Sequence, residues 1–283
     1  MKLEWIPVPF PKRNLMAKIA RMLALLLSVA SLEAGADDAL RQAIAGAHRT
    51  PAFVARDAAR KPYEELMFLG LRPDATVVEI SPGGGYWTEI LAPYLHARGT
   101  FYVAQFPLGS VKGRAGYERA HKAFQDKLAG NAPVYGRVRV TAFAKGYYDI
   151  APPASADFVL TFRNLHNWVA GDYAEAALAA FHRALKPGGI LGVEDHRART
   201  DRLQDPKSAD GYLREDFAID LVRRAGFELV GKSELLANPR DTKDYEKGVW
   251  TLPPTLALGE KDRGKYLAIG EADNFLLMFR KAR

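Results

Sequence analysis

Short apolar runs alternate with helical patterns along most of the chain. Residues 76–80, 100–105 and 156–162 are runs rich in Val, Phe and Thr, which predicts buried strands. Residues 172–185 and 214–225 instead place apolar side chains at three- and four-residue spacing, which predicts helices. Strands that alternate with helices favour an α/β fold with a doubly wound, mostly parallel sheet.

Four further strands complete a predicted sheet of seven. They are residues 137–143, 190–194, 227–232 and 274–280. Residues 38–70 precede the sheet and are expected to form N-terminal helices, with a break where Lys61 meets Pro62. Residues 237–273 are rich in proline and glycine, so we expect a loop-rich insertion that covers one end of the sheet.

Two segments between these elements carry local signals. Residues 111–128 form a helical pattern rich in Lys and Arg, which we interpret as a solvated lid or edge. Lys186-Pro187-Gly188-Gly189 is expected to end the preceding helix, because proline cannot continue a helix and glycine favours its C-terminus.

The first 36 residues differ from the rest of the chain. Four basic residues between positions 12 and 21 precede an apolar run, 22–32, and then Ala34-Gly35-Ala36. This order is typical of a cleavable export signal, and the run is short for a membrane span. We therefore expect cleavage before Asp37, a periplasmic location, and a mature single domain, 37–283, without a stable membrane span. An amphipathic N-terminal helix is the alternative.

Composition narrows the function classes. A chain of 283 residues with 48% hydrophobic content can bury the core of one elaborated domain. Cysteine is absent, which excludes disulfides, thiolate metal sites and cysteine nucleophiles. Of 40 basic and 33 acidic residues, the first 36 positions hold five and two, which leaves 35 and 31 and a net charge of +4. This mild, scattered charge does not favour a nucleic-acid partner.

A glycine-rich turn follows the strand 76–80. Pro82-Gly83-Gly84-Gly85 lets the backbone turn tightly and approach a ligand, and a helical pattern begins at Trp87. A strand, a glycine turn and a helix N-terminus form the entrance of a nucleotide-type site. A dinucleotide fingerprint is disfavoured, because Thr88 stands where its third glycine would be. A plain tight turn remains an alternative.

The order of these elements resembles class I S-adenosylmethionine-dependent methyltransferases over residues 74–280. The glycine turn, Lys186-Pro187-Gly188-Gly189 and the last strand carry this resemblance. It implies a seven-stranded sheet with an antiparallel last strand and S-adenosylmethionine as cofactor. The acceptor is unidentified, and we expect a small molecule. The segments 161–168, 194–197 and 238–241 also resemble a group of bacterial predicted methyltransferases that often carry signal peptides.

The resemblance implies a set of cofactor contacts. Glu79 would bind the methionine ammonium, and Gly83 and Gly85 would allow close approach. The full set is Glu79, Ser81, Pro82, Gly83, Gly85, Tyr86, Gln105, Asp149 and Asn164. Three positions depart from the family pattern. Gln105 replaces an acid that holds the ribose, and Ser81 replaces a glycine, so we expect a negative φ at Ser81. Pro93 lies inside the helix after the glycine turn, where it should cost hydrogen bonding unless it kinks the helix.

Candidate chemistry gathers where the strands end, because ligands of open α/β sheets bind beyond the carboxyl ends. His166 and His196 are candidate bases for methyl transfer, together with Asp195, because imidazole titrates near neutral pH. Asn164, Asn167 and Trp168 are candidates for orienting an acceptor. The alternative is structural: turn hydrogen bonds, a core Trp168, and a solvated strand end at 194–197.

Three function hypotheses remain. The leading one is methyl transfer from S-adenosylmethionine, and a non-catalytic ligand-binding protein on the same scaffold is the alternative. A metal site built from His166, Asp195 and His196 is a third possibility, but no HxH or HExxH spacing supports it and we assign no metal. The absence of G-x-S-x-G disfavours a serine hydrolase.

Overall fold

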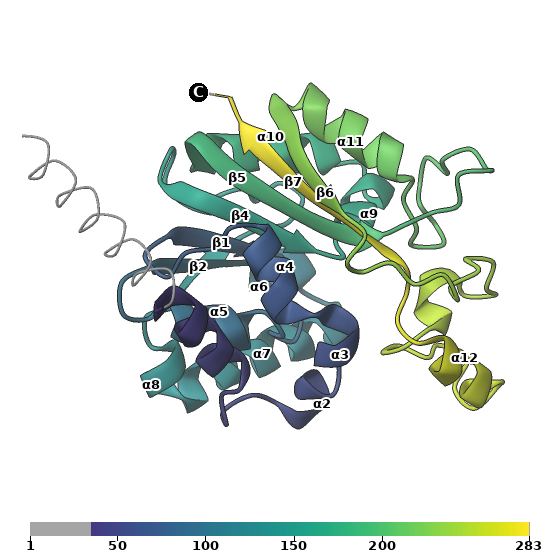
Figure 1. The fold of residues 1–283 in the computed structure, drawn as a ribbon, viewed down its shortest axis with the longest axis horizontal. Coiled ribbons are helices and arrows are strands. Elements are labelled where there is room, and N and C mark those ends of the chain that lie inside the picture. The colour runs from purple at the N-terminus through teal and green to yellow at the C-terminus, as the bar shows by residue number, and fades with distance from the viewer. Residues whose placement is uncertain (1–34, 283) are drawn as a thin grey trace, which may run out of the picture.

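A computed structural model describes residues 35–282 and contains one seven-stranded sheet (Figure 1). The strand order is β3-β2-β1-β4-β5-β7-β6. The strands are β1 (Thr76–Ile80), β2 (Thr100–Gln105), β3 (Arg139–Ala142), β4 (Ala156–Phe162), β5 (Leu185–His196), β6 (Phe227–Ser233) and β7 (Asn274–Lys281). The neighbours from β3 to β5 pair in parallel, whereas β7 pairs antiparallel with both β5 and β6. The predicted fold class is confirmed.

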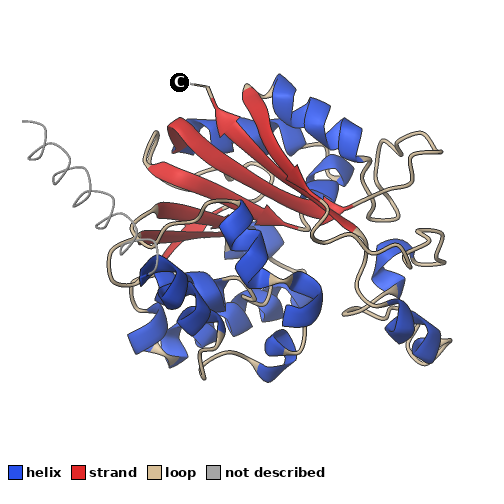
Figure 2. Cartoon of the chain, viewed as in Figure 1, coloured by secondary structure: helices blue, strands red, loops and turns tan. Residues whose placement is uncertain are grey.

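Helices cover both faces of this sheet (Figure 2). The first helix includes residues 35–44. The others are α2 (Pro51–Val54), α3 (Asp57–Arg60), α4 (Pro62–Phe68), α5 (Thr88–Leu95), α6 (Leu108–Val111), α7 (Ala115–Gly130), α8 (Ala132–Tyr135), α9 (Leu165–Ala170), α10 (Ala174–Ala184), α11 (Glu215–Arg224), the 3₁₀ helix η1 (Gly248–Thr251) and α12 (Arg263–Ile269). None of the helices among residues 35–282 is long and apolar enough to cross a membrane.

Two apolar layers hold the sheet between the helices. Successive residues of β1 point to opposite faces, so Val77 belongs to the layer that contains residues of α4 and α5, and Val78 to the layer that contains residues of α9, α10 and α11. In β4, Phe158 joins the first layer and Val159 the second. Burial on both faces explains why these strands are continuous apolar runs.

Two predicted boundaries differ from the structure. The segment 38–70 is helical as expected, but in several short helices; Lys61 has a left-handed φ of 43° directly before Pro62 starts α4. Lys186-Pro187-Gly188-Gly189 follows the end of α10 but lies within β5, where it forms a bulge. Pairing with β4 passes from Ala156↔Leu185 to Phe158↔Ile190, with Gly188 at a φ of 79°.

The loop-rich segment 237–273 contains η1 and α12, and Figure 1 shows α12 beyond one end of the strands. A small apolar cluster that includes Tyr212, Val249, Leu252 and Tyr266 supports it. The predicted export signal, residues 1–36, lies outside the described residues except for its last two positions.

Pro93 lies inside α5, where it lacks the amide hydrogen that would bind the carbonyl of Glu89. The ring of His48 takes this place, with Nε2 2.7 Å from the Glu89 carbonyl oxygen, so an Nε2–H group donates. The Glu89 carboxylate also accepts hydrogen bonds from Thr50 and Lys127. The hydrogen bond that the proline removes is therefore replaced from outside the helix.

We expect His48→Ala to lower the free energy of unfolding by about 1–3 kcal/mol, because the buried Glu89 carbonyl would lose its donor. In a Pro93→Ala background the same change should cost less, because the new amide can donate to Glu89. Denaturant titration of the four proteins measures this coupling. An equal cost of His48→Ala in both backgrounds would contradict the interpretation.

Candidate functional site

The chain reverses direction directly after β1. Ser81 donates its amide to Ala104 of β2 at 2.9 Å and then adopts a φ of 53°. The expectation of a negative φ at Ser81 was wrong. Because the Ser81 amide still bonds to β2, the hydrogen bonding of β1 extends one residue further and the chain reverses at Ser81 itself. A left-handed conformation of serine costs about 1–2 kcal/mol.

The glycines of this turn serve different purposes. Gly83 has a φ of 58°, and no atom lies within 4 Å of the position where a Cβ would stand. Gly85 has a φ of 90°, and a Cβ there would lie 3.1 Å from the ring of Phe124. Gly83 therefore leaves open space for a ligand, whereas Gly85 allows α7 to pack closely.

A cavity of about 520 Å³ opens at the carboxyl ends of the parallel strands. Its walls come from the turn after β1, Phe106 after β2, residues 110–117, Phe143 to Lys145 after β3, and α9 with Tyr173. A volume of this size is typical of small-molecule and cofactor sites, which hold roughly 300–1,000 Å³. We call this the larger cavity.

A second cavity of about 290 Å³ adjoins it. The N-terminal helices contribute Phe53, Arg56 and Arg60, the sheet contributes residues at the ends of β4 and β5, and residues 249–255 cover it. We call this the smaller cavity. Both cavities are lined by Ser81, Gly83, Asn164 and Asn167, so molecules bound in the two would meet at this common wall.

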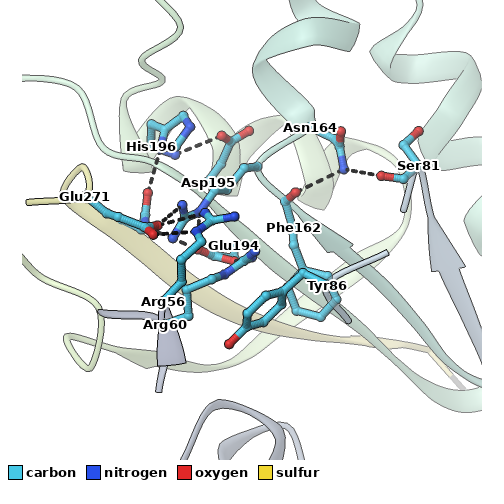
Figure 3. A network of polar contacts seen from close by, with 12 residues as sticks. Arg56, Arg60, Ser81, Tyr86, Phe162, Asn164, Glu194, Asp195, His196 and Glu271 are labelled. Atoms are coloured by element: carbon cyan, nitrogen blue, oxygen red, sulfur yellow. Dashed lines mark hydrogen bonds and ion pairs between the residues drawn. The ribbon is translucent and has the colours of Figure 1, made fainter. Parts of the chain in front are cut away.

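Asn164 fixes the common wall. Its Nδ2 donates to the carbonyl of Phe162 at 3.0 Å and lies 3.3 Å and 3.4 Å from the carbonyls of Ile80 and Ser81 (Figure 3). The amide thus joins the end of β1 to the end of β4. Its position immediately before α9 explains why the following side chains also face the cavities.

Asp195 holds the two candidate histidines together. Its Oδ1 lies 2.7 Å from His166 Nδ1 and accepts the amide of His196 at 2.8 Å, and its Oδ2 accepts the amide of His166 at 2.8 Å. Burial acts to raise the pKa of Asp195, but the charge and hydrogen bonds of His166 outweigh it and leave this pKa below its usual value. Because Nδ1 of His166 faces a carboxylate, Nε2 is the ring nitrogen left for a ligand.

His196 has a different environment. Its Nδ1 lies 2.7 Å from Oδ1 of Asn274, an atom that can only accept, so Nδ1 carries a hydrogen. Burial lowers the pKa of His196 to about 3, against the opposing effect of Asp195. His196 is therefore neutral near pH 7, and its Nε2 is a hydrogen-bond acceptor.

His166, Asp195 and His196 can also each place one ligand atom within 4.8 Å of the others, a spacing compatible with a metal ion. Both carboxylate oxygens and both Nδ1 atoms already have hydrogen-bond partners. Within residues 35–282, no hydrogen bond engages either Nε2 atom, so these two atoms are the ligands that the group can offer. A metal ion at this place could therefore bind two imidazole nitrogens, whereas the Asp195 carboxylate already accepts hydrogen bonds from His166 and His196.

A buried chain of ion pairs includes three arginines that line the smaller cavity, Arg56, Arg60 and Arg163; Figure 3 labels the first two. Glu271 binds Arg56 at 2.6 Å and also Arg163, and Glu194 binds Arg163 at 2.7 Å and Arg60 at 3.1 Å. Glu194 and Asp195 are fully buried, so the alternative of a solvated strand end was wrong. Buried carboxylates need such partners, because an unpaired buried charge is strongly unfavourable.

The remaining predicted cofactor contacts divide into two groups. Pro82 and Tyr86 line the smaller cavity. Glu79, Gly85, Gln105 and Asp149 line neither cavity. Gln105 is buried and accepts from Gln125 at 2.9 Å, and Asp149 is exposed.

Glu79 is 1% exposed, and its Oε2 accepts from the hydroxyl of Thr88 at 2.6 Å. Burial raises the pKa of Glu79 to about 7, although the Thr88 hydrogen bond acts in the opposite direction. The carboxyl group is thus directed to the first residue of α5 and titrates near neutral pH.

Several residues around the cavities were not predicted. Arg56, Arg60 and Glu271 lie in segments without a recognisable motif, and no local signal identifies them. Phe143 is the last residue of a predicted strand, and Tyr117 lies in the predicted lid. These positions are the only sequence signals that connect the two residues with a site. Trp168 is 2% exposed and packs edge-on against Phe143, so it serves both the core and the larger cavity.

No protein-family model matches the chain, and no curated protein matches it. Solved structures do resemble it. A SAM-dependent methyltransferase from Aquifex aeolicus is 16% identical over 80% of this chain and 92% of its own, with a TM-score of 0.51. The [4+2]-cyclase SpnF is 16% identical over 80% and 81%, with a TM-score of 0.52. A candidate sarcosine dimethylglycine methyltransferase from Galdieria sulphuraria is 13% identical over 80% and 84%, with a TM-score of 0.54. At these identities the likeness shows the class I methyltransferase fold.

The raised pKa of Glu79 predicts a pH-dependent stability. The folded protein holds this proton more tightly than the unfolded chain, so the contribution is present below pH 4.5 and is lost as pH rises through 7. Between pH 5 and pH 8, Glu79→Gln should gain about 2–3 kcal/mol of unfolding free energy relative to the native sequence. Urea titrations at the two pH values measure this, and a constant difference would disprove it.

Proposed function

We propose that this protein is an S-adenosylmethionine-dependent methyltransferase that acts on a small-molecule acceptor. The observation that carries the proposal is the pair of cavities that meet at Ser81, Gly83, Asn164 and Asn167. Methyl transfer requires a donor and an acceptor in contact at one point, and two adjoining cavities meet this requirement. The fold shared with a SAM-dependent methyltransferase adds support.

The larger cavity suits the cofactor. The open space at Gly83 admits close backbone approach, and Phe106, Tyr117 and Phe143 line the cavity and could pack against a flat base. When bound, S-adenosylmethionine supplies an electrophilic methyl group on a sulfonium. The residues present therefore fit this cofactor, with the adenosine part assigned to the larger cavity.

In this proposal His166 is the general base. Its ring lines the smaller cavity and is oriented by Asp195, which leaves Nε2 to take the proton of an acceptor hydroxyl or amine. The Asp195 carboxylate would then stabilise the imidazolium. His196, which stays neutral, would accept a hydrogen bond and orient the acceptor.

The elements around the smaller cavity would exclude water from the reaction. Phe53, Val249, Trp250 and the Pro253–Pro254 pair line this cavity. These side chains come from the N-terminal helices and from the loop-rich segment 237–273. A mainly apolar cover strengthens hydrogen bonds to the acceptor, because it lowers the local dielectric constant.

A ligand-binding protein without methyl transfer is the second candidate. Glu79 and Gln105, at positions that would bind the cofactor's ammonium and ribose, line neither cavity. A fold of this kind also occurs in SpnF, which is named as a cyclase. Binding and transfer must therefore be tested separately.

For binding, we expect S-adenosylhomocysteine to raise the unfolding free energy by about 2.7 kcal/mol at 100 times its dissociation constant. Gly83→Ala should weaken the ligand about tenfold or more, because the methyl group would enter the open space at the common wall. Gly70→Ala is the matched control: Gly70 also has a positive φ, 72°, with open space around a Cβ, but lies outside both cavities. Calorimetry compares the three proteins, and absence of binding to the native sequence would reject the cofactor assignment.

For transfer, purified protein is incubated with S-adenosylmethionine carrying a labelled methyl group and a small-molecule extract of the producing cells. Under the first candidate, His166→Gln should lower the rate of label transfer about 10²-fold or more while S-adenosylhomocysteine affinity is unchanged. Under the second, the native protein binds the ligand and transfers no label.

We also propose that residues 1–36 direct export and that the mature domain begins at Asp37. The sequence pattern is the support, and the proposed first mature residue, Asp37, accepts hydrogen bonds from Tyr63 and Arg41. Expression of the full chain in a bacterium with a periplasm should yield a periplasmic protein whose mass corresponds to residues 37–283. A cytoplasmic product of full mass would reject this.

A further inference from the structure

The smaller cavity has one strongly charged wall. Arg56 and Arg60 of the N-terminal helices and Arg163 at the end of β4 all line it. Their guanidinium groups are largely buried: the side chains are 20%, 6% and 11% exposed. Arginine side chains in folded proteins are mostly exposed to solvent, so three buried ones that line the same cavity call for an explanation.

The wall carries more positive than negative charge. Glu194 and Glu271 are its paired carboxylates, and three guanidinium groups share them, which leaves a net charge of +1. Glu65 also lies close to this cluster, but its buried oxygens have no hydrogen-bond partner. Burial raises the pKa of Glu65 well above its ordinary value, which favours the neutral carboxyl group, and no hydrogen bond or ion pair joins it to the third arginine.

Free donors accompany the excess charge. Glu271 accepts from Nε and Nη2 of Arg56, and Glu194 accepts from Nη2 of Arg60. Within residues 35–282, Nη1 of Arg56 and Nη1 of Arg60 make no hydrogen bond. Both residues line the cavity, so each can present this group to a bound molecule.

We propose that Arg56 and Arg60 form a subsite for an anionic group, a carboxylate or a phosphate, of the small molecule held in the smaller cavity. The anion would balance the unpaired charge of the wall and accept from the two free Nη1 groups. The His166 ring lines the same cavity, so an acceptor anchored at the arginines would lie within the same enclosure as the candidate base.

Two molecules could present this group: an acidic acceptor, or the amino-acid end of the cofactor. The anion subsite itself follows from the charges of the wall, and only the assignment to acceptor or cofactor rests on the proposed function. The larger cavity takes the adenosine in that proposal, and the amino-acid end would point toward the common wall. A test must therefore separate the two sources.

The probe is inorganic phosphate, titrated by calorimetry at low ionic strength against the native sequence, Arg56→Gln and Arg72→Gln. Arg56 is chosen because Glu271 keeps its second partner, Arg163, when Arg56 is replaced. Arg72 is the control, because it is 57% exposed, pairs with Asp74 and lies outside both cavities. We expect Arg56→Gln to weaken phosphate about tenfold or more and Arg72→Gln to leave it within about twofold.

Arg56→Lys keeps the charge without the planar fork and should give an intermediate loss, which guards against a general folding defect in Arg56→Gln. Circular dichroism of each variant checks the fold. Equal phosphate affinity of Arg56→Gln and Arg72→Gln, or no saturable binding to the native sequence, overturns the proposal.

Two adenosine ligands then identify the source. If phosphate still binds through Arg56 when S-adenosylhomocysteine saturates the protein, the anion belongs to the acceptor. If Arg56→Gln weakens S-adenosylhomocysteine but not 5′-methylthioadenosine, which lacks the amino-acid part, it belongs to the cofactor. If neither adenosine ligand binds but phosphate binds through Arg56, the proposed function is rejected and the anion subsite is retained.

Discussion

The buried ion-pair chain from Arg56 through Glu271, Arg163 and Glu194 to Arg60 joins the N-terminal helices, which take no part in strand pairing, to the sheet. It ties the N-terminal helices to the end of β4, to β5 and to the segment before β7, across as many as 215 positions of sequence. Removing one member of a buried pair costs roughly 3–5 kcal/mol, because the other charge is left unpaired. The wall of the smaller cavity and the attachment of the N-terminal helices therefore depend on the same interactions.

Most of the fold could be predicted because its strands are local apolar patterns. The boundaries of β1, β2 and β4 follow the sequence to the residue, since each strand is buried on both faces and ends where polar or turn residues begin. β5 begins earlier than its apolar run, at Leu185, because pairing with β4 draws Lys186-Pro187-Gly188-Gly189 into a bulge. Such a bulge depends on the neighbouring strand, and no local pattern reports it.

The site was predictable where it lies at strand ends and not elsewhere. Topology places Ser81, Asn164, His166 and His196 around the cavities, as strand-end reasoning expects. The arginines 56 and 60 escaped prediction because their role comes from carboxylates more than 100 positions away. Charge pairing between distant positions produces no recognisable residue spacing. The carboxyl ends of parallel strands can be located in the sequence, because each follows a strand pattern.

One carboxylate gives two neighbouring histidines different chemistry. Asp195 faces Nδ1 of His166, so a proton gained by that ring would lie against a negative charge. Nδ1 of His196 faces the neutral amide of Asn274 instead, and the ring centroids are 5.3 Å apart. Two imidazolium rings at this distance would repel each other in a buried site. Only one of the two rings can therefore carry the charge, and the carboxylate at Nδ1 of His166 supports His166 as the proton acceptor and His196 as a neutral hydrogen-bonding partner.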